Sequence, residues 1–372
     1  MAPFVIREER LAIRRQQFAR VTAGILGLAV LHIAGSAHGQ AALRDQTSGL
    51  VANASGAQTW KDRFAGSFVD LSTYVGSGTF YTSGYHNPYV SNALFLRPTF
   101  SLGTPLRLSL NARVYLEQEY TTPDTPNGRS FYPSDSWLFL TAKNLYTMPT
   151  AKVRFSGTIR MILPTSYESR YAHLVTGLGI SGGATRMFDL GAVGTTDKRW
   201  SLLVNLGTGF TKYVRTSEVR GDFAGDTSGC RAAGPPSGAG VGSASDSDRC
   251  GGPLNTSFAV TTSGMVALSR GPLALTVTLA LFNEFKYAIA PSTEIQIYMA
   301  TDQIVRGRND MTWGIVSLGY EITPHATVAI GISSFQPALD SRYQNIRFPF
   351  FDFNGTNANN STQAFVSLTG TL

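Results

Sequence analysis

The sequence has few cysteines, few histidines and no long apolar run after residue 40. Only two of its 372 residues are cysteine and five are histidine. These residues are not spaced as zinc ligands are, and we expect no metal or other cofactor. No segment after residue 40 supplies the ~20 apolar residues of a transmembrane helix. The formal net charge is +7 without a basic cluster, which argues against a nucleic-acid partner.

The N-terminal segment has the three parts of an export signal. Several arginines within Arg7–Arg20 precede the apolar stretch Val21–Gly35, and Ala37-His38-Gly39 is a small-x-small cleavage site. A retained membrane anchor is the alternative, but an apolar run of about 15 residues is shorter than the ~20 that span a bilayer. We therefore expect a signal peptide over residues 1–39, cleaved so that the exported chain starts near Gln40.

The rest of the chain alternates apolar and polar residues over long stretches. The segments Leu106–Tyr120 and Thr362–Leu372 show this period clearly. Alternation is typical of a strand with one apolar and one polar face. We expect twelve strands, at Phe68–Phe80, Asn92–Leu102, Leu106–Tyr120, Ser136–Met148, Lys152–Leu163, His173–Phe188, Arg199–Arg215, Thr256–Ser269, Leu273–Tyr287, Asp310–Ile322, His325–Gln336 and Thr362–Leu372.

The strand lengths and connections favour a membrane barrel over an exported soluble β-protein. Many of these strands have 11 to 15 residues, whereas ordinary strands average ~5–6 and a spanning strand needs ~9–11. Short turns such as 103–105 and 270–272 alternate with long connections such as 216–255. We expect an all-β, transmembrane antiparallel meander β-barrel of about twelve strands over residues 67–372, with residues 40–66 as a periplasmic N-terminal tail.

One segment near the start of the barrel has two interpretations. Its apolar residues recur at helical spacing: Trp60, Phe64, Phe68, Leu71 and Val75. The segment could form a periplasmic helix or a plug that enters the lumen. An even number of strands places both chain ends on the same side, and this count favours a strand before Tyr81.

Part of the sequence resembles a known class of barrels. Asp70–Phe80, followed by Asn87-Pro88-Tyr89 and Leu94–Leu102, looks like the start of porin-like barrels of Gram-negative bacteria. The chain also looks somewhat like the transporter barrels associated with aromatic-compound degradation. The resemblance implies an outer-membrane location and passive passage of small solutes. The last strand is similar to the signal read by the barrel-assembly machinery, although Leu372 stands where that pattern usually has Phe or Trp. The implied partners are this machinery, outer-membrane lipid, lipopolysaccharide and small solutes.

Charged residues on the predicted strands indicate the face toward the lumen, because a charge facing lipid costs roughly 2–4 kcal/mol. The expected pore-lining residues are Arg107, Arg113, Glu117, Glu119, Lys143, Lys152, Arg154, Arg160, Arg186, Glu284, Lys286 and Glu321. These charges could form salt bridges that neutralise one another and support the lumen. They could instead give a net positive field that favours anions. The outcome depends on which side chains meet across the barrel.

Two long connections carry further candidate features. Cys230 and Cys250 lie in a connection rich in Gly, Ser and Asp, and in an exported protein they are expected to form a disulfide. The connection 337–361 contains four phenylalanines: Phe348, Phe350, Phe351 and Phe353. These rings could close the barrel mouth, contact lipopolysaccharide acyl chains or form a hydrophobic ligand site. Packing of the connection on itself is the alternative.

The sequence does not favour an enzyme. His86 is the nearest candidate for a catalytic base, but Ser91 is five residues away and would face the opposite side of a strand. The leading hypothesis is an outer-membrane channel or transporter for passive passage of small solutes, with a weak preference for anions. The alternative is a structural or adhesion barrel with a plugged lumen and ligand-binding extracellular loops.

Overall fold

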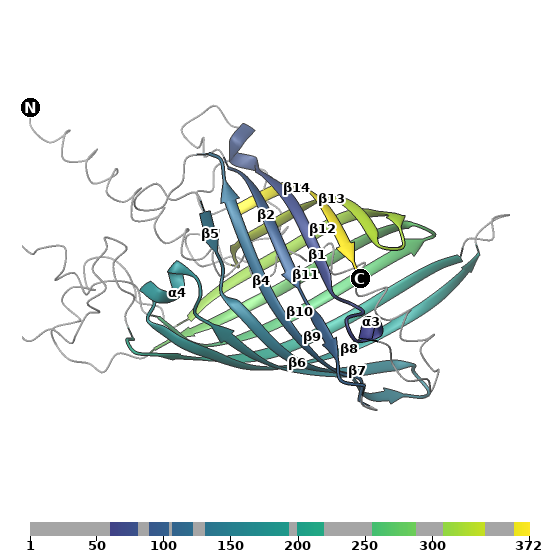
Figure 1. The fold of residues 1–372 in the computed structure, drawn as a ribbon, viewed down its shortest axis with the longest axis horizontal. Helices are drawn as coiled ribbons and strands as arrows, with labels where there is room; N and C mark the ends of the chain where they lie inside the picture. The colour runs from purple at the N-terminus through teal and green to yellow at the C-terminus, as the bar shows by residue number, and fades with distance from the viewer. Residues whose placement is uncertain are drawn as a thin grey trace, which may run out of the picture.

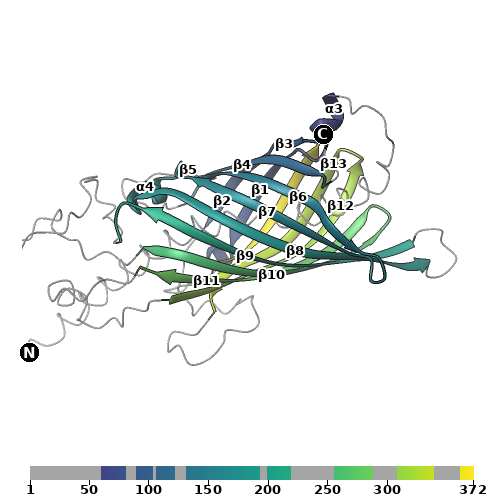
Figure 2. The same ribbon diagram turned by 90° about the horizontal axis from the view of Figure 1, so that it is seen from below.

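A computed structural model describes residues 60–80, 89–103, 106–121, 131–192, 199–218, 255–287, 308–338 and 361–372. These residues form a closed antiparallel β-barrel, seen from two sides in Figures 1 and 2. The all-β barrel of twelve strands expected from the sequence is confirmed. Within the described ranges, no helix is both long enough and apolar enough to cross a membrane.

Several β-segments combine into the twelve barrel strands, since β3 continues β2 and β5 leads into β6 along the edge of β4. The segments are β1 (Phe68–Gly76), β2 (Val90–Arg97), β3 (Thr99–Ser101), β4 (Leu108–Glu119), β5 (Phe131–Pro133), β6 (Ser136–Met148), β7 (Val153–Leu163), β8 (Leu174–Ala192), β9 (Arg199–Arg215), β10 (Thr256–Arg270), β11 (Leu273–Lys286), β12 (Arg308–Thr323), β13 (Ala326–Pro337) and β14 (Ser361–Thr371). The short helices are α3 (Trp60–Arg63), η2 (Ser77–Phe80) and α4 (Tyr167–Tyr171). We call the end of the barrel at the β6–β7, β10–β11 and β12–β13 turns the turn end, and the opposite end the loop end.

The ring is closed through the first strand. β1 pairs with β14 on one side and with β2 on the other, and β2 pairs with β4. The hydroxyl of Thr369 in β14 donates a buried hydrogen bond of 2.6 Å to Oδ2 of Asp70 in β1. The ring of described strands therefore has no free edge to which another chain could add a strand.

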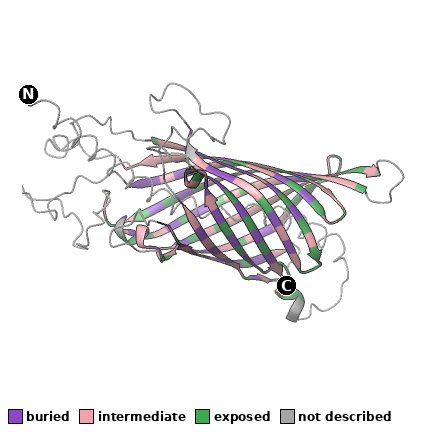
Figure 3. Cartoon of the chain, turned by 90° about the horizontal axis from the view of Figure 1, so that it is seen from above, coloured by how far each residue is buried: buried purple, intermediate pink, exposed green. Residues whose placement is uncertain are grey.

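Burial alternates along the strands, as the purple and green bands in Figure 3 show. In β4, every second residue from Ser109 to Glu119 is buried, while the intervening Leu110 is 49% exposed. The exposed outer face carries large apolar side chains all round the barrel, among them Leu71, Ile159, Ile180, Leu206, Ile330 and Val366. An exposed apolar surface of this extent is suited to contact with lipid.

Two strands are interrupted for identifiable reasons. Pro98 lacks an N–H and separates β2 from β3, although its carbonyl still accepts a 3.1 Å hydrogen bond from the Ala112 N–H. Asp135 lies between β5 and β6. Its carboxylate accepts hydrogen bonds from the Ser166 N–H, at 2.9 Å, and from the Ser169 hydroxyl. These bonds hold α4 at the loop end of the barrel.

The expected end of the sixth strand at Phe188 is wrong. The pairing of β8 with β9 continues to Ala192, so this hairpin extends past the neighbouring β10–β11 hairpin (Figure 2). Asp189 supports the extension, because it accepts a 2.9 Å hydrogen bond from the Gly191 N–H and forms a 3.1 Å ion pair with Arg199. This polar cross-strand pair lies beyond the position at which the strand was expected to end.

The first strand is confirmed, and the helical interpretation holds only for α3. β1 starts at Phe68 and ends at Gly76, four residues earlier than expected, because η2 occupies Ser77–Phe80. The residues before β1 also contact the barrel, since the rings of Phe64 and Phe100 pack edge to face at 5.4 Å. This part of the expected tail therefore lies against β3, while residues 40–59 are outside the described ranges.

Candidate functional site

The inner face of the barrel has two chemically different sides. An aromatic wall is formed by inward residues of β1, β2, β4, β11, β12 and β14: Phe68, Tyr74, Ala93, Phe95, Tyr115, Ala280, Trp313, Ile315 and Phe365. A polar wall faces the lumen from β7–β10: Ser156, Thr158, Arg160, Ser181, Gly183, Asn205, Gly207, Gly209, Thr261 and Ser263. A second apolar cluster on β6–β10, which includes Trp137, Ile162 and Tyr213, borders the polar wall.

Two of the expected pore-lining acids are buried and hydrogen-bonded to hydroxyl groups. Glu117 is 5% exposed and accepts hydrogen bonds from the hydroxyls of Tyr89 and Tyr115, the latter at 3.2 Å. Glu119 is 8% exposed and accepts from Thr121 at 2.9 Å and from Tyr132 at 3.3 Å. Hydroxyl donors lower the cost of burying these carboxylates.

Two of the expected pore-lining arginines flank one tryptophan. The guanidinium carbons of Arg113 in β4 and Arg160 in β7 lie 5.3 Å and 5.2 Å from the ring of Trp137 in β6. Arg113 also lies 4.9 Å from the ring of Phe95. The pairing of β6 with both neighbours creates this stack, because Trp137 is opposite Arg113 in one ladder and Arg160 is opposite Phe139 in the other. Cation–π contacts of this kind contribute ~0.5–2 kcal/mol each.

Neither arginine has a carboxylate partner among the described residues. Arg113 is 7% exposed, and its Nε and Nη2 atoms are buried without a hydrogen-bond partner there. Arg160 donates to the hydroxyl of Thr211, while its Nε is unpartnered. An unpaired buried charge costs several kcal/mol, so an anionic group that reached these two guanidinium groups would lower that cost.

Glycines on β8 make room for Arg160 and for a recess beside it. A Cβ atom on Gly179 would lie 2.7 Å from Arg160 Cγ and 3.0 Å from the Phe210 carbonyl oxygen. A Cβ on Gly177 would meet Ile162 at 2.8 Å. The recess has a volume of about 250 Å³ in the polar wall. Glycine at positions 177 and 179 of β8 therefore allows the side chains of Ile162 and Arg160 in β7 to pack against the β8 backbone.

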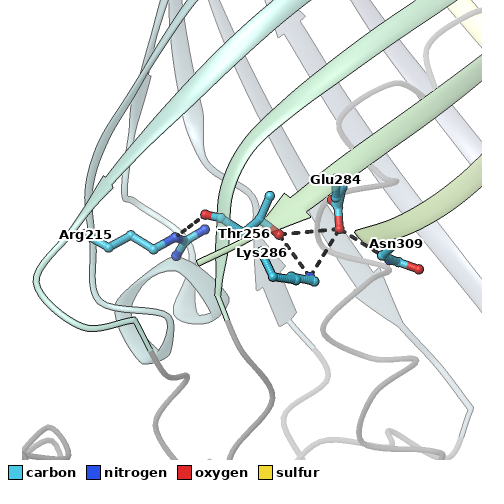
Figure 4. A network of polar contacts seen from close by, with 5 residues as sticks. All are labelled: Arg215, Thr256, Glu284, Lys286 and Asn309. Atoms are coloured by element: carbon cyan, nitrogen blue, oxygen red, sulfur yellow. Dashed lines mark hydrogen bonds and ion pairs between the residues drawn. The ribbon is translucent and has the colours of Figure 1, made fainter. Parts of the chain in front are cut away.

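A second polar network lies at the loop end of the barrel (Figure 4). Glu284 and Lys286 of β11 form a 3.5 Å ion pair, and both approach the hydroxyl of Thr256 in β10. Arg215 of β9 donates to the Thr256 carbonyl at 3.1 Å, and Asn309 of β12 donates to Glu284 at 3.3 Å. Four adjacent strands are joined here, and two of the expected pore-lining residues neutralise each other.

The remaining expected pore-lining residues lie near the turn end. Arg107 and Lys152 precede β4 and β7 and have positive φ angles of 50° and 51°. Lys143 lies in the irregularity of β6 between Ala142 and Tyr146. Arg154 is opposite Thr185 of β8, and Glu321 is opposite Thr327 of β13. These residues are half-buried or exposed, so they lie toward the rim rather than beside the central stack.

Arg186 is not an inward residue. In β8 it is exposed and stands opposite Val204, while its neighbour Thr185 is buried and accepts a 2.7 Å hydrogen bond from Asn205. Its guanidinium instead lies 4.3 Å from the ring of Phe188 on the outer face. The position near the turn end lets a long cationic side chain on this face reach water.

One buried lumen residue, Asp70, was not among the residues expected from the sequence to line the pore. Asp70 is 2% exposed on the inner face of β1 and accepts hydrogen bonds from Ser72 and Thr369. The alternation Phe68, Asp70, Ser72 carried a signal for it. The candidate residues from the sequence that lie outside the described ranges are Cys230, Cys250, Phe348, Phe350, Phe351, Phe353 and His86.

Comparisons with known proteins give distant structural similarity. No family model and no curated protein matches the sequence. An outer-membrane channel of the COG4313 type from Pseudomonas putida F1 is 10% identical, with a TM-score of 0.45, over 82% of this chain and 95% of that one. The outer-membrane protein OpdK from Pseudomonas aeruginosa is 10% identical over 82% and 98%, with a TM-score of 0.28. The DcaP channel of Acinetobacter baumannii is 9% identical over 82% and 96%, with a TM-score of 0.27.

Cysteine substitutions at two adjacent positions in the middle of β7 show which face of the strand is in contact with water. Thr158 borders the recess, whereas Ile159 is 60% exposed on the outer face. We expect a cysteine at Thr158 to react with a charged, water-soluble thiol reagent in a reconstituted bilayer, and a cysteine at Ile159 to be protected by lipid. The unsubstituted protein gives the background labelling. Faster labelling at Ile159 than at Thr158 would reverse the two faces, because a one-residue slip exchanges them.

Proposed function

We propose that this protein is an outer-membrane channel or transporter for the passive passage of small solutes, with a weak preference for anions. The observation that carries the proposal is the lumen of a closed barrel in which Arg113 and Arg160 lack carboxylate partners among the described residues. Fixed positive charge raises the local concentration of anions in a confined aqueous path. The apolar outer face supports residence in a membrane.

Conductance in a planar bilayer tests the proposal. The purified full chain should give stable stepwise currents, and a salt gradient should give a reversal potential of the sign expected for anion passage. The preference should weaken as salt rises, because the Debye length falls from about 10 Å at 0.1 M to about 3 Å at 1 M. A folded barrel that carries no current would contradict the channel function.

The aromatic wall favours one competing function. Its rings pack together across neighbouring strands, as in the contacts of Phe68 with Phe95 at 5.3 Å and of Tyr74 with Phe365 at 5.8 Å. Such packing would also suit a structural or adhesion barrel with a filled lumen and ligand-binding loops. That alternative would be supported if the folded protein carried no current in planar bilayers and the intact protein bound purified lipopolysaccharide.

The N-terminal segment and the two cysteines add predictions about export. A cleaved signal over residues 1–39 implies that the exported chain starts near Gln40, which N-terminal sequencing of the membrane-extracted protein reads directly. Signal peptides lead to an oxidising compartment, where disulfides persist.

We expect Cys230 and Cys250 to be bonded in the exported protein. Closing a loop of this length stabilises the folded state by about 3 kcal/mol in the chain-entropy account. Thiol labelling of the unreduced, denatured protein should find no free cysteine, and labelling after reduction should find both. Two reactive thiols before reduction would show that the bond does not form.

A further inference from the structure

The recess in the polar wall contains hydroxyl groups that have no hydrogen-bond partner among the described residues. Its lining includes Ser156, Ser181, Thr261 and Ser263, and none of these four hydroxyls hydrogen-bonds another described residue. Asn205 lines the same recess and donates a hydrogen bond from its amide nitrogen to Thr185, which leaves its side-chain oxygen available as an acceptor. Each hydroxyl can donate one hydrogen bond and accept two. The wall therefore presents several unused donors and acceptors to whatever occupies the recess.

Glycines keep this recess open. A Cβ atom on Gly207 would lie 3.0 Å from the Ser263 hydroxyl oxygen, and one on Gly183 would lie 3.2 Å from that of Ser156. Any side chain at these inward positions would fill the space in front of the hydroxyls. The volume of about 250 Å³ is close to the lower limit of small-molecule pockets. It suits a solute of about six carbon atoms better than a larger one.

A fixed positive charge borders the recess. Arg160 belongs to the lining, lies flat over Gly179 and stacks on Trp137, and has no carboxylate partner among the described residues. Arg113, on the other side of Trp137, adds a second unpaired guanidinium. Guanidinium groups bind carboxylates through strong charge-assisted hydrogen bonds.

We propose that this recess is a binding site for a small polyhydroxylated carboxylate, a sugar acid, during its passage through the lumen. The carboxylate pairs with Arg160, and the hydroxyl groups of the solute bind Ser181, Thr261 and Ser263. The inference rests on the proposed channel function, because the lumen must admit the solute. A neutral sugar leaves Arg160 unpaired, and a simple carboxylate leaves the hydroxyls of the wall without partners, so each binds less well.

Isothermal titration of the full chain in detergent at low salt tests the site without relying on conduction. The probes are glucuronate, glucose and propanoate. We expect glucuronate to bind at least about tenfold more tightly than either of the others. Equal affinity for glucuronate and propanoate would overturn the hydroxyl contribution, and equal affinity for glucuronate and glucose would overturn the role of Arg160.

Matched variants locate the binding. Arg160→Gln should reduce the affinity for glucuronate about tenfold or more, while Arg186→Gln, on the outer face of β8, should leave it unchanged. Gly207→Ala places a methyl group in front of Ser263. This variant should bind glucuronate more weakly than the parent protein and bind propanoate with the same affinity. Unchanged glucuronate affinity in both Arg160→Gln and Gly207→Ala would place the solute elsewhere.

The titration and the bilayer measurement separate two kinds of failure. Stepwise anion currents without preferential glucuronate binding would contradict the proposed sugar-acid site but not the proposed channel function. Preferential glucuronate binding by a barrel that carries no current would overturn the channel function and retain the recess as a binding site.

Discussion

Arginine at Ile180 is expected to lower the free energy of unfolding by about 2–4 kcal/mol in a bilayer. Ile180 is 61% exposed on the outer face of β8, opposite Ile159 near the middle of β7. If this face contacts lipid as proposed, the substitution places a charge in hydrocarbon far from either surface. Guanidinium-induced unfolding in phospholipid vesicles measures the loss directly.

Arginine at Ser181 is the matched control for this substitution. Ser181 is the next residue of the same strand and faces the recess in the lumen, where water can hydrate the added charge. We expect this variant to unfold at nearly the same denaturant concentration as the parent protein. A greater loss at Ser181 than at Ile180 would contradict the assignment of inner and outer faces.

Replacing both Arg113 and Arg160 by serine is expected to change the selectivity of the channel from anions to cations. The substitution removes two positive charges from the central stack and leaves Glu117, Glu119 and Asp70 in the lumen, each at least 90% buried. The reversal potential in a salt gradient should therefore change sign at low ionic strength. The single variants should give intermediate values, since each retains one guanidinium.

Arg186→Ser serves as the control for selectivity. It removes the same charge from the same barrel, but from the outer face, so its reversal potential should match that of the parent protein. Anion preference that persists in the double serine variant would mean that Arg215 or the residues at the turn end set the selectivity. That result would place the narrowest part of the path away from Trp137.

Simple alternation was enough to predict most of the barrel. In β4 every second residue from Ser109 to Glu119 is buried, and the apolar Leu108, Leu110, Ala112, Val114 and Leu116 fall on the other face, because the sequence keeps a period of two. The same reasoning failed for Arg186. Gly182 and Gly183 occupy successive positions in β8, and glycine gives no indication of which face is apolar. The side on which Arg186 lies follows from the ladders of β8 with β7 and β9.

The arrangement of the candidate site could not be predicted from any one strand. Trp137, Arg113 and Arg160 belong to three strands, and they meet only because the registers of both ladders place them side by side. The space occupied by Arg160 depends on Gly179 in a fourth strand. Single-strand patterns specify which side chains point inward. Cross-strand registers decide which of them become neighbours.

The bond between Asp70 and Thr369 has a consequence for the order of assembly. These partners are separated by 299 positions in the chain, so β1 has no partner for one of its edges until the final hairpin has been made. Every other neighbouring pair on the β6–β14 side can form locally, one hairpin after another. Joining the two ends carries the largest loop-closure entropy of any step and is expected to be slow. During that interval the edges of β1 and β14 are exposed, and a chaperone or insertion factor that occupies them would control when the ring closes.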